Sequence, residues 1–327
     1  LLIGLLGTTF FFQNVYTIMD KITKIKVVGV GGSGSNAITR MMKCKLEGVE
    51  LIAINTDLQD LKKTNAHTKI RIGKESTKGL GTGMNPNLGR LAAEEDRETI
   101  KQAISGADLI FITCGLGGGT GTGVAPVIAQ IAKEMDILTI AVVTTPFSFE
   151  GKERLRIASK GEEVLKSSVD TLISVSNDKL YGFIDSKMSI DSAFWMCDEV
   201  LRQAVSGISD LITLPGIINI DFADVKAMLK NSGSAIFGIG IASGENRYKE
   251  ATLSALNSPF IDVSCNKAKG VLFNVSGGED ISLVEINEIA KTIKERVSSD
   301  ARIIFGAVQG EDLKKGEIKV TVVVTGF

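Results

Sequence analysis

Apolar runs without polar alternation recur along the first half of the chain, and segments with helical spacing lie between them. Strands of this kind are typical of a parallel sheet whose two faces are both covered by helices. We therefore predict an α/β fold built on a doubly wound parallel sheet. The expected strands are 25–30, 49–54, 107–113, 138–144 and 169–175, and the expected helices among them are 36–42, 88–103, 124–134 and 152–166.

A long helix is expected next, over residues 190–212. Its apolar residues fall at spacings of three and four, and Pro215-Gly216 ends it. A second, smaller α/β unit follows, with helices at 222–230, 247–257 and 281–297 and strands at 235–242, 270–275, 301–308 and 317–325. The predicted organisation is a disordered N-terminal extension (1–20), a first domain (21–189), a central helix (190–215) and a C-terminal α/β domain (216–327).

Residues 1–19 contain an apolar stretch that Gly and Thr interrupt. It is shorter than the roughly 20 residues that span a bilayer. It also lacks the basic segment and the small-residue cleavage site of a secretory signal. We expect an upstream extension of the reading frame, with Met19 resembling a start, and no direct membrane insertion; a peripheral membrane anchor is the alternative.

The composition excludes several classes of function. The net charge is −1, so nothing marks the surface for nucleic acid or for an anionic membrane. The single histidine, His67, excludes a His-rich metal site and disfavours a Ser-His-Asp triad. The four cysteines are far apart and form no CxxC pair, which is typical of reduced, mostly buried thiols in a cytosolic protein. Catalysis must therefore use carboxylates, backbone dipoles and a bound metal.

The segment 115–123, GLGGGTGTG, carries the strongest chemical signal. It joins an expected strand to an expected helix, where free backbone N–H groups and the positive end of the helix dipole converge on an anion. This arrangement predicts a phosphate site. The GxxxxGK(S/T) pattern of the common phosphate loop does not occur in the chain.

A second glycine loop, GVGGSG at 29–34, follows the first strand, and Asp57 ends the second. Alone, this GxGxxG pattern favours a Rossmann nicotinamide-dependent oxidoreductase. A dinucleotide fold, however, has no use for a second and richer phosphate loop. Two loops at the same edge of one sheet indicate a nucleoside triphosphate that is held from both sides, with Mg²⁺ bridging its phosphates.

Several motifs together resemble FtsZ, the bacterial tubulin relative that builds the division ring. They occur in the family's order from Lys24 to Phe327: GVGGSGSNA at 29–37, NTD at 55–57, GGGTGTG at 117–123, TPFSFEGK at 145–152, ISDLITL at 208–214, NIDFAD at 219–224 and GENR at 244–247. The resemblance implies a GTP-binding domain, a central helix, a C-terminal α/β domain and GTPase activity that depends on assembly.

The resemblance also implies roles for individual residues. The GTP contacts would be Gly32, Ser33, Gly34, Ser35, Asn36, Gly119, Thr120, Gly121, Glu150, Arg154, Asn177, Phe194 and Asp198. Among these, Asn177 and Asp198 would read the guanine edge and Phe194 would stack on the base. Some of them allow a simpler interpretation: Glu150 and Arg154 are four residues apart and match an ion pair at a helix start, and Phe194 could belong to the core.

Candidate catalytic residues lie in NIDFAD, namely Asn219, Asp221 and Asp224. The helix from Asp198 to Ile212 rises roughly 20 Å, so these carboxylates cannot reach the γ-phosphate of their own subunit. A neighbouring subunit must supply them, and such a head-to-tail contact propagates as a filament. The simpler interpretation is that the two aspartates complement the dipole at a helix start.

We therefore expect a cytoplasmic GTPase that binds GTP or GDP with Mg²⁺ and assembles with itself into the division ring at mid-cell. Division proteins and membrane anchors are the partners that the resemblance implies. A related tubulin-like filament for plasmid segregation or cell shape shares the same motifs and is the alternative.

Overall fold

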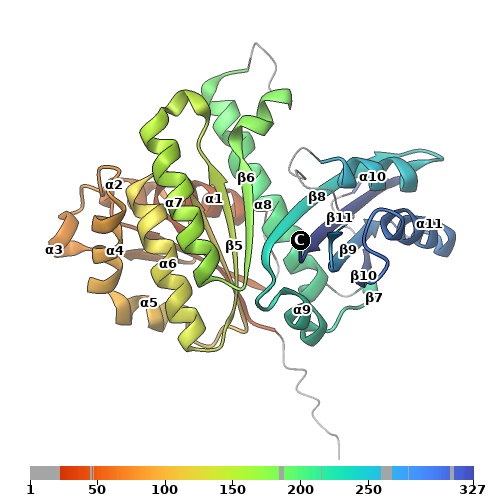
Figure 1. Ribbon diagram of the computed structural model, residues 1–327, viewed down its shortest axis with the longest axis horizontal. Coiled ribbons are helices and arrows are strands. Elements are labelled where there is room, and N and C mark those ends of the chain that lie inside the picture. Colours follow the sequence, from red (N-terminus) through yellow and green to blue (C-terminus); the bar gives the residue numbers. More distant parts are fainter. Residues whose placement is uncertain are drawn as a thin grey trace, which may run out of the picture.

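An eleven-stranded sheet runs through both lobes of the computed structural model (Figure 1). The structure describes residues 23–44, 46, 48–183, 188–214, 216–258, 267–278, 280–309 and 313–327. Within these residues the strand order is β3-β2-β1-β4-β5-β6-β8-β11-β9-β10-β7. The extension expected at 1–20 lies outside the described residues.

The N-terminal lobe contains the predicted parallel sheet, and every pair of neighbouring strands in it is parallel. Its strands are β1 (Ile25–Val30), β2 (Val49–Asn55), β3 (Thr68–Arg71), β4 (Leu109–Gly115), β5 (Leu138–Thr145) and β6 (Thr171–Ser176). Alternate residues of one strand point to opposite faces. Val27 joins one buried cluster and Val28 the other, so the strands are apolar throughout because both faces are covered.

Helices pack on both faces of this lobe (Figure 1). They are α1 (Gly31–Lys43), α2 (Leu58–Lys63), α3 (Lys74–Thr77), α4 (Pro86–Glu95), α5 (Arg97–Ile104), α6 (Gly119–Glu134) and α7 (Lys152–Ser168), with short 3₁₀ turns η1 (Ser148–Glu150) and η2 (Asn177–Phe183). The cluster behind Val28 contains residues of α4, α5, α6 and α7. The cluster behind Val27 contains residues of α1 and of the long helix.

Three details of the predicted elements are wrong. The helix expected over 88–103 is two helices, because Asp96 leaves the helical path and accepts a hydrogen bond from the Gly73 amide (2.7 Å). The polar stretch 57–77 contains α2, β3 and α3, which were not predicted because no long apolar pattern marks them. The helices expected at 36–42 and 124–134 begin earlier, at Gly31 and Gly119, so glycines with little helix propensity form their first turns.

The predicted central helix is α8, which spans Ile190–Thr213 between the two lobes (Figure 1). The Ser189 side chain caps its start by accepting a hydrogen bond from the Ser192 amide. Leu201, Val205 and Ile208 are fully buried in one core with β1 and α1. The three- and four-residue spacing of these side chains therefore corresponds to the face that packs against the sheet.

The C-terminal lobe is a mixed sheet with helices packed against it. Its elements are β7 (Gly216–Ile218), α9 (Phe222–Leu229), β8 (Gly233–Ser243), α10 (Arg247–Leu256), β9 (Gly270–Gly277), α11 (Leu283–Lys294), β10 (Arg302–Gln309) and β11 (Glu317–Thr325). Strand β11 is antiparallel to both β8 and β9. The short pairing of β6 with β8 continues one sheet from lobe to lobe. The boundaries at 189 and 215 stay a prediction.

The described cysteines are free: Cys44 is exposed, and Cys114 and Cys197 are buried. Cys265 lies outside the described residues. None of the helices in the described part of the chain is both long and apolar enough to cross a membrane.

Candidate nucleotide site

A cavity of about 410 Å³ opens at the carboxyl ends of β1, β4, β5 and β6, where ligands bind in open parallel sheets. Its walls include both predicted glycine loops, the turn after β5 and the start of α8. Most of the predicted contact residues line it: Gly32, Ser33, Asn36, Gly119, Thr120, Gly121, Glu150, Arg154, Asn177, Phe194 and Asp198. Gly34 and Ser35 do not line it.

The two glycine loops touch each other at the floor of the cavity. A Cβ on Gly31, which has a φ of +69°, would lie 3.2 Å from the Gly121 amide nitrogen. A Cβ on Gly119 would lie 2.3 Å from the Thr82 hydroxyl oxygen. Gly31 therefore lets the first turn of α1 lie against that of α6, and Gly119 lets α6 begin close to the loop that carries Thr82. The first contact places two helix N-termini at one anion site.

Gly34 permits a close approach between two elements, and its predicted contact with phosphate stays a prediction. A Cβ at this position would lie 2.6 Å from the Thr113 carbonyl oxygen, so the glycine lets α1 cross close to β4. Ser35 is 1% exposed and its hydroxyl has no hydrogen-bond partner among the described residues. Neither residue is among those that line the cavity.

Three threonine hydroxyls meet at the phosphate end of the site. The Thr120 hydroxyl lies 2.8 Å from that of Thr56 and 3.1 Å from that of Thr82. Thr82, which sequence reasoning missed, comes from a glycine-rich loop that lines the cavity. Thr56 stands in the NTD motif, so the resemblance marked its position without giving it a role. These hydroxyls add donors to the backbone N–H groups of the two loops.

Oxygen atoms that could accompany Mg²⁺ gather beside this end. Asp60 accepts a hydrogen bond from the Asn55 side chain (2.7 Å), and its Oδ2 lies 3.5 Å from where a Cβ of Gly32 would be. Burial and the nearby Asp57 raise the pKa of Asp60. No group of three His, Cys, Asp or Glu side chains forms a metal site within the described ranges. Hydroxyl and carboxylate oxygens suit Mg²⁺ held chiefly by phosphates.

The opposite end of the cavity carries buried polar groups that suit a nucleobase. Asn177 and Asp198 are each 5% exposed, and the Asn177 Oδ1 lacks a partner among the described residues. Burial raises the pKa of Asp198 to about 6, and the nearby Arg40 opposes that rise. Phe194 packs edge-on against Phe147, with 5.7 Å between ring centroids. A buried acceptor without a partner is costly unless a ligand satisfies it.

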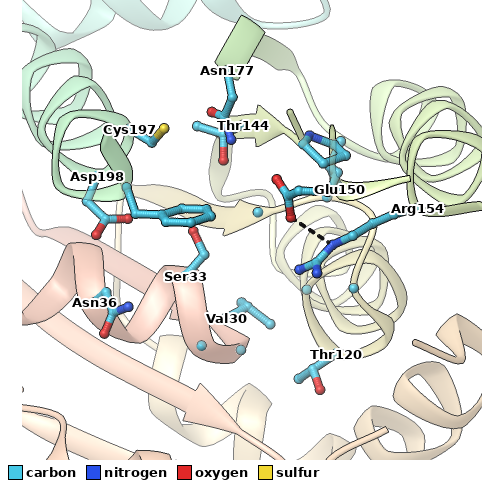
Figure 2. A pocket seen from close by; sticks show the side chains of 18 of the residues that line it. Val30, Ser33, Asn36, Thr120, Thr144, Glu150, Arg154, Asn177, Cys197 and Asp198 are labelled. Carbon is cyan, nitrogen blue, oxygen red and sulfur yellow. Dashed lines mark ion pairs between the residues drawn. The ribbon is translucent and has the colours of Figure 1, made fainter. Parts of the chain in front are cut away.

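Figure 2 shows Asp198 and Cys197 on one side of the cavity and Glu150 with Arg154 on the other. The Glu150–Arg154 pair has an N···O distance of 3.3 Å and joins the end of η1 to the first turn of α7. Glu150 also accepts a hydrogen bond from the Phe147 amide (2.9 Å). The ion pair that the spacing allowed is therefore present, and it lines the cavity as well.

The predicted catalytic residues lie outside the cavity, near α9. Each already has a local partner: Asn219 accepts from the Gly216 amide (2.7 Å), Asp221 caps α9, and Asp224 pairs with Arg302 (2.8 Å). Helix α8, about 36 Å long, runs between the cavity and this segment. One subunit does not bring the two groups together.

Comparison with known proteins identifies the class. Residues 24–185 match the model of the Tubulin/FtsZ family GTPase domain, and residues 233–327 match that of the FtsZ family C-terminal domain. With the cavity described above, these matches define a GTPase of the tubulin/FtsZ fold, whose ligands are GTP and GDP. This class replaces the nicotinamide-dependent oxidoreductase that the glycines at 29–34 allowed.

Solved structures narrow the class to one family. An FtsZ from M. jannaschii, described as an empty dimer, is 50% identical with a TM-score of 0.89 and covers 93% of this chain and 88% of its own. A variant of FtsZ from M. jannaschii is also 50% identical, with a TM-score of 0.90 and coverage of 94% and 92%. The chain belongs to the FtsZ family.

More distant structures share the fold. The GTPγS-bound protofilament of CetZ2 from Haloferax volcanii is 21% identical, with a TM-score of 0.78 and coverage of 92% of each chain. The GDP-bound monomer of CetZ1 from the same organism is also 21% identical, with a TM-score of 0.79 and coverage of 93% and 94%. The tubulin/FtsZ architecture is therefore retained at low sequence identity.

Proposed function

We propose that this GTPase assembles head to tail into the filaments of a cell-division ring and hydrolyses GTP where subunits meet. One observation carries the proposal: among the described residues, those that line the nucleotide cavity include no free carboxylate at its phosphate end, and the nearby Asp60 is hydrogen-bonded to Asn55. The lining carboxylates are Glu150, which pairs with Arg154, and Asp198, which lies at the base end. A group that orients the attacking water must then come from another subunit.

Nucleotide binding is assigned from the geometry of the cavity. Backbone N–H groups at the starts of α1 and α6, together with the Thr120 hydroxyl, hold the phosphates. The Asp198 carboxylate accepts hydrogen bonds at the guanine edge, the Asn177 amide offers an acceptor and a donor there, and Phe194 stacks on the base. Bound Mg²⁺ would neutralise charge on the β- and γ-phosphates beside the oxygens of Thr56 and Asp60.

The acidic segment 216–224 lies at the other end of α8 from the cavity. It supplies the missing half of the proposed hydrolysis site. The Asp224 side chain is 52% exposed, so a neighbour's nucleotide can approach it. Asp221 and Asn219 hold the segment in shape around it through their local hydrogen bonds. Contact between different faces of two identical subunits does not close, so it propagates as a filament. The dimer and protofilament descriptions of the related structures support self-association.

The division ring is favoured over plasmid segregation or a role in cell shape. The C-terminal lobe matches the FtsZ model specifically, and the two FtsZ structures are half identical to this chain. We place the protein in the cytoplasm at mid-cell, with division proteins and membrane anchors as further partners. Imaging of a fluorescently tagged chain in dividing cells tests the placement: a mid-cell ring supports it, and filaments along the cell length favour the alternative.

The shared site is tested by measuring GTP turnover per subunit across a range of protein concentrations. Turnover should be near zero in dilute monomers and rise cooperatively as filaments form. A mixture of Asp224→Ala with Thr120→Glu subunits adds a second test. An intact site can form only where the unchanged pocket of an Asp224→Ala subunit meets the unchanged acidic segment of a Thr120→Glu subunit. Partial recovery of hydrolysis is expected. A monomer with full, concentration-independent activity would contradict the shared site.

A further inference from the structure

The carboxylate at the base end of the cavity is held in an unfavourable environment. The Asp198 side chain is only 7% exposed, and its burial raises its pKa to about 6. A protonated carboxyl group cannot accept from both the N1–H and the 2-amino group of guanine. The proposed contact therefore requires something that keeps this acid ionised.

Arg40 meets Asp198 from outside the cavity. Its Nε donates to Asp198 Oδ2 at 3.1 Å, yet Arg40 itself does not line the cavity. It lies one helical turn beyond Asn36, which does line the cavity. Helix α1 therefore presents Asn36 to the ligand and Arg40 to the carboxylate. Arg40 thus acts on Asp198 without touching the space that a base would occupy.

A tryptophan holds the arginine in this position. The Arg40 guanidinium carbon lies 5.2 Å from the centre of the Trp195 ring, which is the only tryptophan of the chain. Trp195 stands on α8 three residues before Asp198, so both partners of Arg40 belong to one face of one helix. A cation over an aromatic ring is attracted to it and loses freedom to point elsewhere.

We propose that Arg40 is a positioning residue for guanine recognition: packed on Trp195, it keeps Asp198 ionised and turned so that its other oxygen meets the base. This inference rests on the proposed guanine contact of Asp198. It adds a determinant of nucleotide choice that lies outside the cavity and that no glycine motif marks.

Other titratable groups stand around the carboxylate. Cys197 precedes it on α8, Glu150 with its partner Arg154 lies across the cavity, and Lys179 lies on η2, which packs against α8. Burial and the charges of Asp198 and Glu150 raise the pKa of Cys197 to about 12, so this thiol stays neutral. Arg40 is the charge that opposes the effect of burial on Asp198.

The experiment compares Arg40→Met with Arg202→Met in the full chain. Methionine keeps an unbranched side chain over Trp195 and removes the charge and the donor. Arg202 is a matched control, because it is similarly exposed (20% against 24%) and pairs with Glu199 away from the cavity. Calorimetry measures GDP and inosine diphosphate affinities across pH. The two ligands share their phosphates, so the ratio of affinities isolates recognition of the 2-amino group.

The wild-type protein and Arg202→Met should prefer GDP to inosine diphosphate at neutral pH. Arg40→Met should bind GDP about tenfold more weakly, the scale of one lost charge-assisted hydrogen bond. Its GDP preference should return as the pH is raised, because Asp198 ionises again. Arg40→Lys keeps the charge, so its GDP affinity should fall between those of the wild type and Arg40→Met. This variant also replaces Arg40→Met in the test if Arg40→Met fails to fold.

Two results would overturn the inference alone: an Arg40→Met protein with wild-type GDP affinity and preference, or one that loses both ligands equally at every pH, as a purely structural defect would. A wild-type chain that does not distinguish the two diphosphates at any pH would overturn the guanine contact as well, and the inference with it.

Discussion

The nucleotide cavity and the acidic segment 216–224 are two halves of one proposed site, and they differ in how their polar groups are satisfied. In the cavity, polar atoms are buried and not all are satisfied: Asn177 Oδ1 lacks a partner among the described residues, and burial raises the pKa of the Asp198 carboxyl group despite its pair with Arg40. In the segment, Asn219, Asp221 and Asp224 are each bonded locally, and Asp224 is half exposed.

This difference indicates how each half depends on its ligand. A cavity with unsatisfied buried atoms is prepared for a nucleotide inside the subunit. A surface segment whose groups are already satisfied needs no ligand to hold its shape, and in the proposed function its carboxylates gain a substrate only when another subunit approaches. Substitutions in the two halves should therefore separate binding from turnover.

The largest effect is expected for Thr120→Glu. The added carboxylate would stand among the threonine hydroxyls at the phosphate end, where it repels a nucleotide's negative charges. Nucleotide binding and assembly should be lost while circular dichroism stays that of the folded protein. Thr99→Glu, on the exposed face of α5, is the control and should bind GTP normally. A folded Thr120→Glu protein with normal GTP affinity would remove 115–123 from the site.

Asp224→Ala should alter turnover and spare binding. The subunit's own cavity is untouched, so calorimetric GTP affinity should equal that of the wild type, and sedimentation should still detect filaments. GTP hydrolysis should slow by about a hundredfold, the lower range for loss of a group that positions or deprotonates water, so the polymers persist. Asp300→Ala, another exposed acid of the same lobe, should hydrolyse GTP at the normal rate. Fast turnover in Asp224→Ala would exclude this carboxylate from catalysis.

Asp198→Ala should weaken GTP binding well beyond tenfold, since it removes a charged acceptor worth about 1.5–3 kcal/mol. In the wild type, guanine binding should also weaken as the pH falls through about 6, because the acceptor becomes protonated. Competition between GTP and ATP measures the choice of base directly. Equal affinity of the wild type for the two nucleotides would show that the guanine assignment is wrong.

The smallest effect is that of Asp198 on folding stability. Ionisation of this carboxyl group favours guanine binding but lowers stability. Folding raises the pKa of Asp198 from 3.8 to about 6, so the folded state binds more protons than the unfolded state between these values. Stability contributed by this group is therefore lost as the pH rises from about 4 to 6. Asp198→Asn should raise the free energy of unfolding at neutral pH, by at most about 3 kcal/mol, and have no effect below pH of about 4. Thermal unfolding of the free protein at both pH values tests this.

Local signals were sufficient for much of the N-terminal lobe and for the two glycine loops of the site. The strands β1, β4 and β5 can be recognised from their continuous apolar sequences, which occur because both of their faces are buried. The glycine loops at 29–34 and 115–123 were predicted to lie at one sheet edge, and both line the cavity, since parallel strands place their carboxyl ends together. The polar elements α2, β3 and α3 were missed, because they are short and have no apolar period.

The sequence by itself determined most strands and helices of the N-terminal lobe, the long helix and the two glycine loops, because each of these segments shows a pattern among residues close together along the chain. Only the tertiary structure decided that Gly34 packs against β4, that Thr56 and Thr82 join Thr120, and that Arg40 reaches Asp198 across 158 positions. These contacts join segments far apart in sequence. Their physical basis is close packing of α1, α6 and α8 around one cavity, which no local pattern encodes.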